Sequence, residues 1–158
     1  MLTADYTLTS TTSAQKAFNT TTNGTLTLPT GVYYFQWFFM ITTMSTTSGN
    51  GTLDPLGGGT ATVDRWGQAS VGVDAASHLT NTTLTGSAAV TASVAMATAA
   101  AGANVRSLVT GFFRVSTGGT LIPSVALTTA AAAVAKAGSW LKIEKIGESS
   151  ETSLGAWT

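Results

Sequence analysis

The stretch from Val32 to Met44 constrains the fold most, because it is apolar on both faces when written as a β-strand. Successive side chains of a strand point to opposite faces. One face would carry Tyr33, Phe35, Trp37, Phe39 and Ile41, and the other Tyr34, Gln36, Phe38 and Met40. A strand of an antiparallel sheet commonly buries one face and leaves the other in water. Here both faces require cover, so we expect one in the core and the other against a partner subunit, and the pattern leaves open which is which.

The charge of the chain bears on its partners. Only 9% of its 158 residues are charged and the formal net charge is zero, whereas a typical domain has about 25% charged residues. This balance provides no steering toward nucleic acid or an anionic membrane, so we expect neither as a partner. Little repulsion opposes close packing of subunits, which favours assembly. No apolar run approaches the ~20 residues that cross a bilayer, and there is no cysteine for a disulfide or a thiolate site.

Short Thr-, Val- and aromatic-rich runs alternate with Gly, Asn and Pro turn signals along the chain, which predicts an all-β sandwich or barrel. The length suits one domain over residues 1–158, with a short polar tail after about residue 147. The segment Thr129–Lys136 is alanine-rich and is expected as a short helical turn or an extended connector. The expected strands are Asp5–Thr9, Thr25–Leu28 with its leucines inward, Val32–Thr43, Thr60–Gly72, Leu84–Val94, Ser107–Val115, Thr120–Thr128 and Ser139–Ile146.

Residues suited to chemistry are sparse. His78 is the only histidine, and a metal site normally requires further imidazoles or thiolates. Asp54, Asp64 and Asp74 recur at intervals of ten, but each lies beside turn residues, where an aspartate commonly bonds to the local backbone. We therefore expect no catalytic residue, no metal ligand and no cofactor, and a chain that is not an enzyme.

Two groups of aromatic and basic residues allow a role in binding. Arg65–Trp66 and the region of Trp37 contain side chains that can stack on sugars, although packing in the core or an interface is the favoured interpretation. Arg106 and Arg114 flank two phenylalanines on one expected strand, where they can pair with acidic groups across an interface and set its register.

Three segments carry a resemblance to a known family. They are Asn23-Gly24-x-Leu26-x-Leu28-x-x-Gly31-x-Tyr33-x-Phe35, Gly111-x-Phe113-x-Val115 and Ala137-Gly138-Ser139-Trp140-Leu141-Lys142-Ile143-x-x-Ile146-Gly147. This combination resembles the jelly-roll domains of the tumour-necrosis-factor/C1q-like type in structural proteins of tailed phages, and the resemblance extends from about Tyr6 to Gly147. It implies an antiparallel two-sheet jelly-roll sandwich that forms a compact homotrimer, with aromatic residues near the threefold axis and no catalytic residues.

The resemblance implies a bacteriophage virion structural protein, a homotrimeric decoration (cement) protein on the capsid surface. Its partners would be further copies of itself and other virion proteins such as the major capsid protein. The alternative is the receptor-binding tip or head domain of a tail fibre or spike, which recognises a host surface glycan or protein. The first expected strand follows Met1 almost at once, which favours decoration for a complete gene product and the receptor-binding tip for a fragment. A third possibility, a glycan depolymerase, has only isolated carboxylates to support it.

Two sets of residues are candidates for contact with partners, in the virion capsid or alternatively in the tail. The candidate oligomer interface comprises Tyr34, Gln36, Phe38, Met40, Phe112, Arg114 and Trp140. The candidate partner-contact loops contain Asn50, Asp54, Asp74 and His78.

Overall fold

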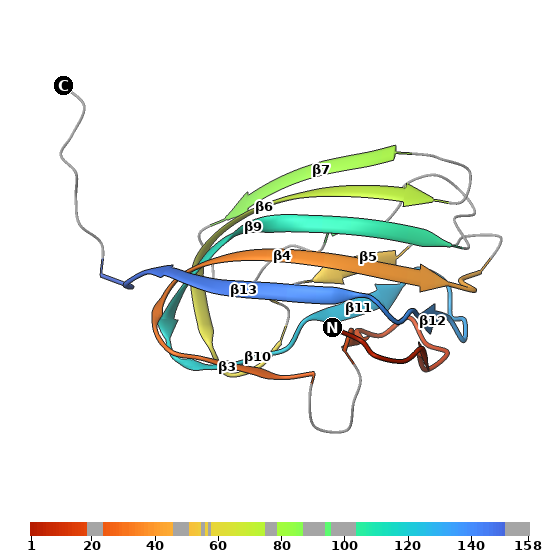
Figure 1. Ribbon diagram of the computed structural model, residues 1–158, viewed down its shortest axis with the longest axis horizontal. Coiled ribbons are helices and arrows are strands. Elements are labelled where there is room, and N and C mark those ends of the chain that lie inside the picture. Colours follow the sequence, from red (N-terminus) through yellow and green to blue (C-terminus); the bar gives the residue numbers. More distant parts are fainter. Residues whose placement is uncertain are drawn as a thin grey trace.

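A computed structural model describes residues 1–18, 24–45, 51–54, 56, 58–74, 79–86, 94–95 and 104–150, with only the backbone described at 73–74, 79–86 and 94–95 (Figure 1). Every element in these ranges is a β-strand and every pairing between them is antiparallel, which confirms the all-β prediction. The strands are β1 (Tyr6–Thr7), β2 (Gln15–Lys16), β3 (Leu26–Leu28), β4 (Gly31–Thr42), β5 (Gly51–Asp54), β6 (Thr62–Asp74), β7 (Leu79–Gly86), β8 (Val94–Ala95), β9 (Val105–Thr117), β10 (Gly119–Leu121), β11 (Ser124–Leu127), β12 (Val134–Ala135) and β13 (Trp140–Gly147).

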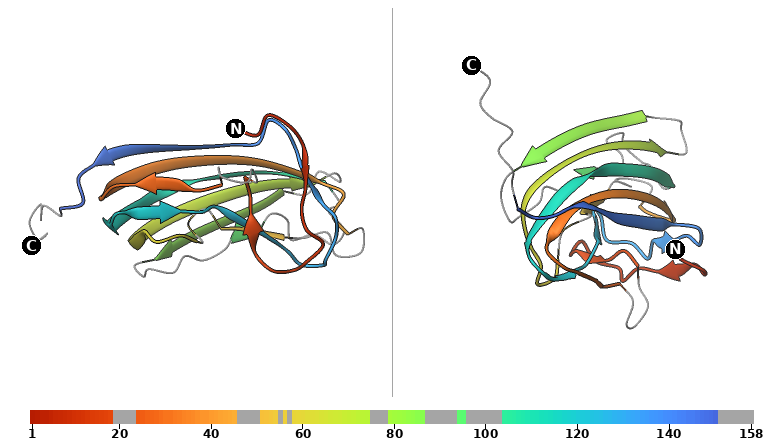
Figure 2. Two further views of the ribbon diagram at one scale, coloured as in Figure 1. Left: turned by 90° about the horizontal axis from the view of Figure 1, so that it is seen from below. Right: turned by 60° about the vertical axis from the view of Figure 1, so that its left-hand side comes forward.

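The strands form two layers, as in a β-sandwich. The large sheet has the order β1-β12-β4-β9-β6-β7, and β13 pairs with β4 on the same side as β12. A four-stranded sheet in the order β2-β11-β5-β8 and a ribbon of β3 with β10 complete the fold. The large sheet curves over these smaller elements, so it has an inner face toward them and an outer face away from them (Figure 2).

Alternation along β4 determines which side chains fill the core. Tyr33, Phe35, Trp37, Phe39 and Ile41 are at most 3% exposed, whereas the residues between them are half-buried. The face with Phe35 is therefore the core face, and the face with Phe38 points outward. Leu53 of β5 and Val125 and Leu127 of β11 belong to the same buried cluster, so both layers contribute to one core.

The structure can be compared with the expected strands, and it adds the short strands β2 and β5, which were not expected. The expected strand Leu84–Val94 overlaps the end of β7 at Gly86 and the start of β8 at Val94, and residues 87–93 between them lie outside the described part. The expected strand Thr120–Thr128 is divided into β10 and β11, because the Ile122 amide bonds to the Gly58 carbonyl and Pro123 has no amide hydrogen to continue the pairing. Of the two leucines of β3, Leu28 packs against the core as expected, whereas Leu26 is 36% exposed.

The alanine-rich segment is extended. Val134–Ala135 form β12 between β1 and β4, and the flanking residues contain no helix. Ala133 and Ala135 are fully buried, so their small side chains pack closely in the core. Of the two alternatives for this segment, the extended connector is correct.

A glycine permits close packing at the centre of the large sheet. Gly111 of β9 lies opposite Phe35 of β4 and Gln68 of β6, on the inner face. A Cβ at this position would lie 2.2 Å from the Gly67 carbonyl oxygen and 2.8 Å from Cε1 of Phe35. The absence of a side chain therefore allows the Phe35 ring to lie against the backbone.

We predict that Gly111→Ala lowers the free energy of unfolding by about 1–3 kcal/mol, because the new methyl group displaces the Phe35 ring or the backbone of β6. Urea denaturation of the purified variant measures this change. Gly147→Ala is the matched control, since its Cβ would meet only Cβ of Val32 at 3.8 Å, and its stability should stay close to that of the parent. Equal stability of the two variants would contradict the packing argument.

Candidate functional site

The outer face of the large sheet brings the candidate interface residues together. Strand register places β13, β4, β9 and β6 side by side, with Trp140 opposite Phe38, Phe38 opposite Leu108, and Leu108 opposite Val71. The next positions on the same face align Tyr34 with Phe112. Each of the seven residues of the candidate interface lies on this face: Tyr34, Gln36, Phe38, Met40, Phe112, Arg114 and Trp140.

A row of apolar side chains crosses the middle of the outer face. The ring centroids of Phe38 and Trp140 are 6.3 Å apart, in a tilted arrangement. Leu108 and Val71 continue the row and are 40% and 42% exposed. Single exposed apolar residues are common on proteins, but residues joined across neighbouring strands form a continuous patch. The sequence motifs did not include Leu108 and Val71, although their place between Phe38 and β7 follows from the strand register.

Phe112 is the most exposed aromatic residue of the patch. It is 53% exposed, and its ring centroid lies 5.3 Å from that of Tyr34. The Tyr34 hydroxyl accepts a hydrogen bond from Oγ1 of Thr110 at 3.0 Å, which holds the ring in place. We call Tyr34, Phe38, Leu108, Phe112, Val71 and Trp140 the outer apolar patch.

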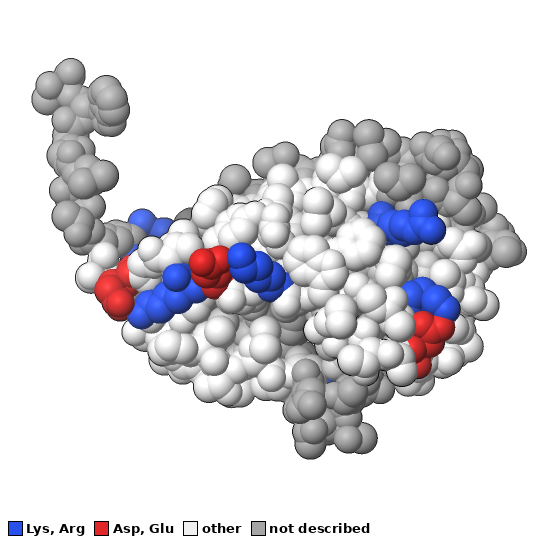
Figure 3. All heavy atoms as spheres, viewed as in Figure 1, with Lys and Arg blue, Asp and Glu red and all other residues white. Residues whose placement is uncertain are grey.

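Among the described residues visible in Figure 3, charged side chains form separate groups with a broad uncharged surface between them, and the strand register places Glu144 beside Tyr34 at the edge of the patch. Along β13, Lys142 contacts Glu144 at 2.8 Å, and Lys145 contacts Glu148 at 2.9 Å. The hydrogen bond from Lys142 lowers the pKa of the Glu144 carboxyl and raises that of the Lys142 ammonium. Both groups are fully solvated, so this pair contributes little to stability.

Arg114 pairs with an acidic group of its own chain. Its Nε donates to Oδ1 of Asp64 at 2.8 Å, and a terminal nitrogen donates to Oδ2 at 2.5 Å. Arg65 lies opposite Arg114 in the strand register, so the Asp64 carboxylate offsets the repulsion between two neighbouring cations. Asp64 thus has a distant partner on β9 in addition to the local hydrogen bond that its carboxylate accepts from its own backbone amide.

The other candidate residues do not form one site. Asp54 ends β5, in the smaller sheet, and its Oδ1 accepts a hydrogen bond from the Leu56 amide at 3.1 Å, which confirms local bonding for this carboxylate. Asp74 is the last residue of β6, in register with Val105, and its side chain lies outside the described part. Asn50 and His78 also lie outside the described residues. Within the described ranges, no group of three metal-ligating side chains occurs.

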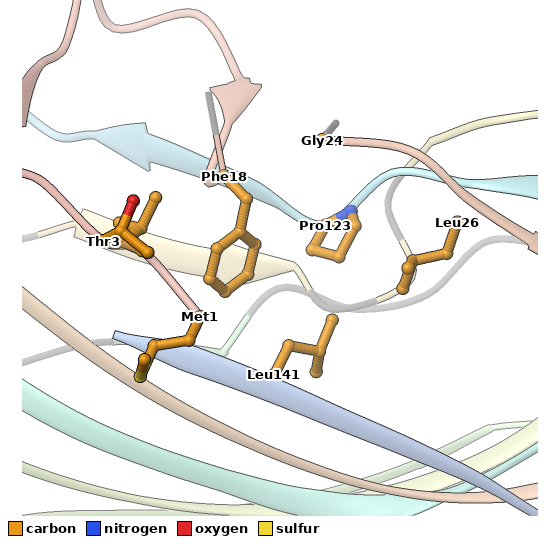
Figure 4. A pocket seen from close by; sticks show the side chains of 8 residues that line it. Met1, Thr3, Phe18, Gly24, Leu26, Pro123 and Leu141 are labelled. Atoms are coloured by element: carbon orange, nitrogen blue, oxygen red, sulfur yellow. The ribbon is translucent and has the colours of Figure 1, made fainter. Parts of the chain in front are cut away.

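Two pockets flank the large sheet. One of about 460 Å³ lies where the chain leaves β13 and is lined by Arg65, Trp66, Phe112 and Arg114, among others. The second, of about 370 Å³, is mainly apolar and lies between the N-terminal segment and Leu141 of β13, with Phe18, Leu26 and Pro123 in its wall (Figure 4). Trp37 is fully buried in the core and cannot stack on a sugar, whereas Trp66 reaches the first pocket. No helix in the described ranges is long and apolar enough to cross a bilayer.

The Asp64–Arg114 pair predicts a pH dependence of stability. The hydrogen bond from Arg114 lowers the pKa of the Asp64 carboxyl below its ordinary value of 3.8, and partial desolvation opposes this shift. The pair therefore contributes stability that is present above this pH and is lost as the pH falls through the lower folded-state pKa.

We expect Asp64→Asn to melt at a lower temperature than the parent at about pH 6, and the difference to shrink toward about pH 3 as Asp64 becomes protonated. Thermal melts followed by circular dichroism at both values measure the difference. Asp54→Asn is the control, because that carboxylate bonds to a backbone amide. A difference for Asp64→Asn that does not change with pH would rule out the ionic contribution.

The outer apolar patch and the two pockets are described from the structure of this chain, and the comparisons with known proteins add nothing to them. No family model matches the chain, and no curated protein or solved structure is significantly similar to it.

Proposed function

We propose that this chain is a structural protein of a tailed-phage virion, which assembles as a homotrimer through its outer apolar patch and decorates the capsid. The observation that carries the proposal is the patch itself, from Trp140 across Phe38 and Leu108 to Val71, with Phe112 beside it. A contiguous exposed apolar surface of this kind marks an interaction site more often than a free surface.

Assembly through this patch requires no chemistry. Burial of apolar area contributes about 25 cal/mol per Å², and an aromatic side chain such as Phe112 supplies a large area at low cost in conformational entropy. The ring is already held by its contact with Tyr34, so little ordering is needed when a second copy binds. The charges at the border would then remain in water, at the polar rim of the interface.

The threefold symmetry and the phage origin depend on the resemblance to the tumour-necrosis-factor/C1q-like jelly rolls. The antiparallel two-layer architecture and the aromatic strand β4 are compatible with such a jelly roll. In this proposal the chain acts by binding its own copies and the underlying shell. Its sparse charge, 9% of residues, favours such packing.

A second candidate is the receptor-binding tip of a tail fibre, and the 460 Å³ pocket favours it. The exposed Phe112 lines this pocket together with Trp66 and the basic residues Arg65 and Arg114, and Glu148 also belongs to its wall. Aromatic rings together with cations suit an acidic sugar of a host surface.

We predict that Phe112→Glu removes the contact through the outer apolar patch, so that the folded chain no longer forms a trimer at micromolar concentration. A buried carboxylate without a partner should weaken the contact at least about 100-fold. Light scattering coupled to size-exclusion chromatography measures the mass. Thr27→Glu on exposed β3 is the control and should leave the mass unchanged. A monomeric parent chain would overturn the trimer.

The position of the chain on the particle separates the two candidates. In an electron-microscopy map of the intact virion, decoration predicts trimeric density on the outer surface of the head. Density confined to the tail, together with adsorption of the purified chain to host cells in competition with phage, would replace decoration with receptor binding.

A further inference from the structure

Among the described residues, one edge of the large sheet has no neighbouring strand along most of β13. Within the described ranges this strand pairs only with β4. The N-terminal segment covers the approach to the strand, where the Leu2 amide bonds to the Ser139 carbonyl and the Gly138 amide bonds to the Leu2 carbonyl. Beyond this point no other described strand pairs with the far side of β13, so its backbone groups there can accept a strand of a partner.

Every second side chain of β13, beginning with the half-buried Trp140 on the outer face, follows a pattern that is complementary to itself. Trp140, Lys142, Glu144 and Ile146 run in the order apolar, cation, anion, apolar. Ile146 is 53% exposed and belongs to the bulge between Lys145 and Gly147. When such a strand meets an antiparallel copy of itself about a two-fold axis, each position faces its mirror position in the pattern.

We infer that two copies of this chain pair through β13, antiparallel and about a two-fold axis at Ile143. Lys142 then lies opposite Glu144 of the second copy, and Glu144 opposite its Lys142, so the charge contact occurs twice. Trp140 lies opposite Ile146 of the second copy, which covers an exposed apolar side chain. Symmetric interfaces of this isologous kind are the commonest in homo-oligomers.

The charges select this register. A shift of the second strand by two residues keeps the same faces together and still pairs most of the strand. In that register Glu144 would lie opposite Glu144 of the second copy, and Lys142 opposite its Ile146. Like charges directly opposite each other destabilise a strand pair, whereas opposite charges stabilise it. The alternation of sign at Lys142 and Glu144 therefore favours one alignment of the two strands.

The contact goes beyond the proposed trimer, because it uses the edge of the sheet and its main-chain groups and not the outer apolar patch. The two contacts can be tested separately. Phe112→Glu removes the patch contact, and in this background the β13 contact alone should produce a dimer.

The experiment uses Lys142→Glu and Glu144→Lys, each combined with Phe112→Glu. Lys142→Glu places carboxylates opposite each other in the pair, and Glu144→Lys places ammonium groups opposite each other. We expect each variant alone to be a monomer, with the dissociation constant raised about tenfold or more. An equimolar mixture of the two should recover the dimer, because each changed residue then meets an opposite charge on the other copy. The lost contact between Lys142 and Glu144 within one chain cannot be repaired by mixing.

Analytical ultracentrifugation measures the masses, and circular dichroism verifies that each variant is folded. Lys16→Glu in the same background is the control, since this exposed lysine lies on β2 of the smaller sheet and its reversal should leave the dimer intact. A monomeric Phe112→Glu parent, a dimer that survives Lys142→Glu, or a mixture that stays monomeric would each overturn the β13 contact. A Phe112→Glu chain that remains trimeric would instead count against the patch. In that case the mixture of Lys142→Glu and Glu144→Lys chains would test the β13 contact, because it should form assemblies larger than the trimer and each variant alone should not.

Discussion

Burial of one face of β4 against the smaller sheets is the interaction on which the rest of the structure depends. The rings of Phe35, Trp37 and Phe39 fill the space between the layers and contact aromatic groups of β9 and of the segment after β2. This burial fixes the register of β4, because a shift by one residue would exchange its two faces. Once the register is set, the positions of β9 and β13 on either side of β4 follow from their pairing with it.

The same register explains why the outer face has an apolar patch. Threonines would be compatible with a solvated outer face, and this chain uses them freely elsewhere, as in β7. On β4 it instead places Tyr34 and Phe38 outside, and the neighbouring strands add Phe112, Leu108 and Trp140 at matching positions. Core packing does not require these side chains, since the inner face already fills the space between the layers. Their alignment across separate strands is more readily explained by a contact outside the subunit.

Long strands could be predicted from the sequence, whereas short strands could not. The strands β4, β9 and β13 could be predicted because alternation over many residues is a strong signal, and the outward positions of Lys142 and Glu144 followed from it. Two-residue strands such as β12 have no such signal and form only where other strands accept them. The contact between Asp64 and Arg114 joins residues that are 50 positions apart, next to a bulge, and no local pattern indicates which strands will be neighbours.

Because charged side chains are few in this chain, the position of each one indicates where charge has a role. A chain with 9% charged residues can leave its strands uncharged, yet β13 carries two lysines and a glutamate at the one edge that its pairing with β4 leaves open. Charge of one sign at an open edge would only repel a second strand. Charge of alternating sign repels it in some registers and attracts it in one, so it selects an alignment. The outer face and the edge of β13 therefore differ in what they provide: the face provides apolar area without a fixed register, and the edge provides a register with little apolar area.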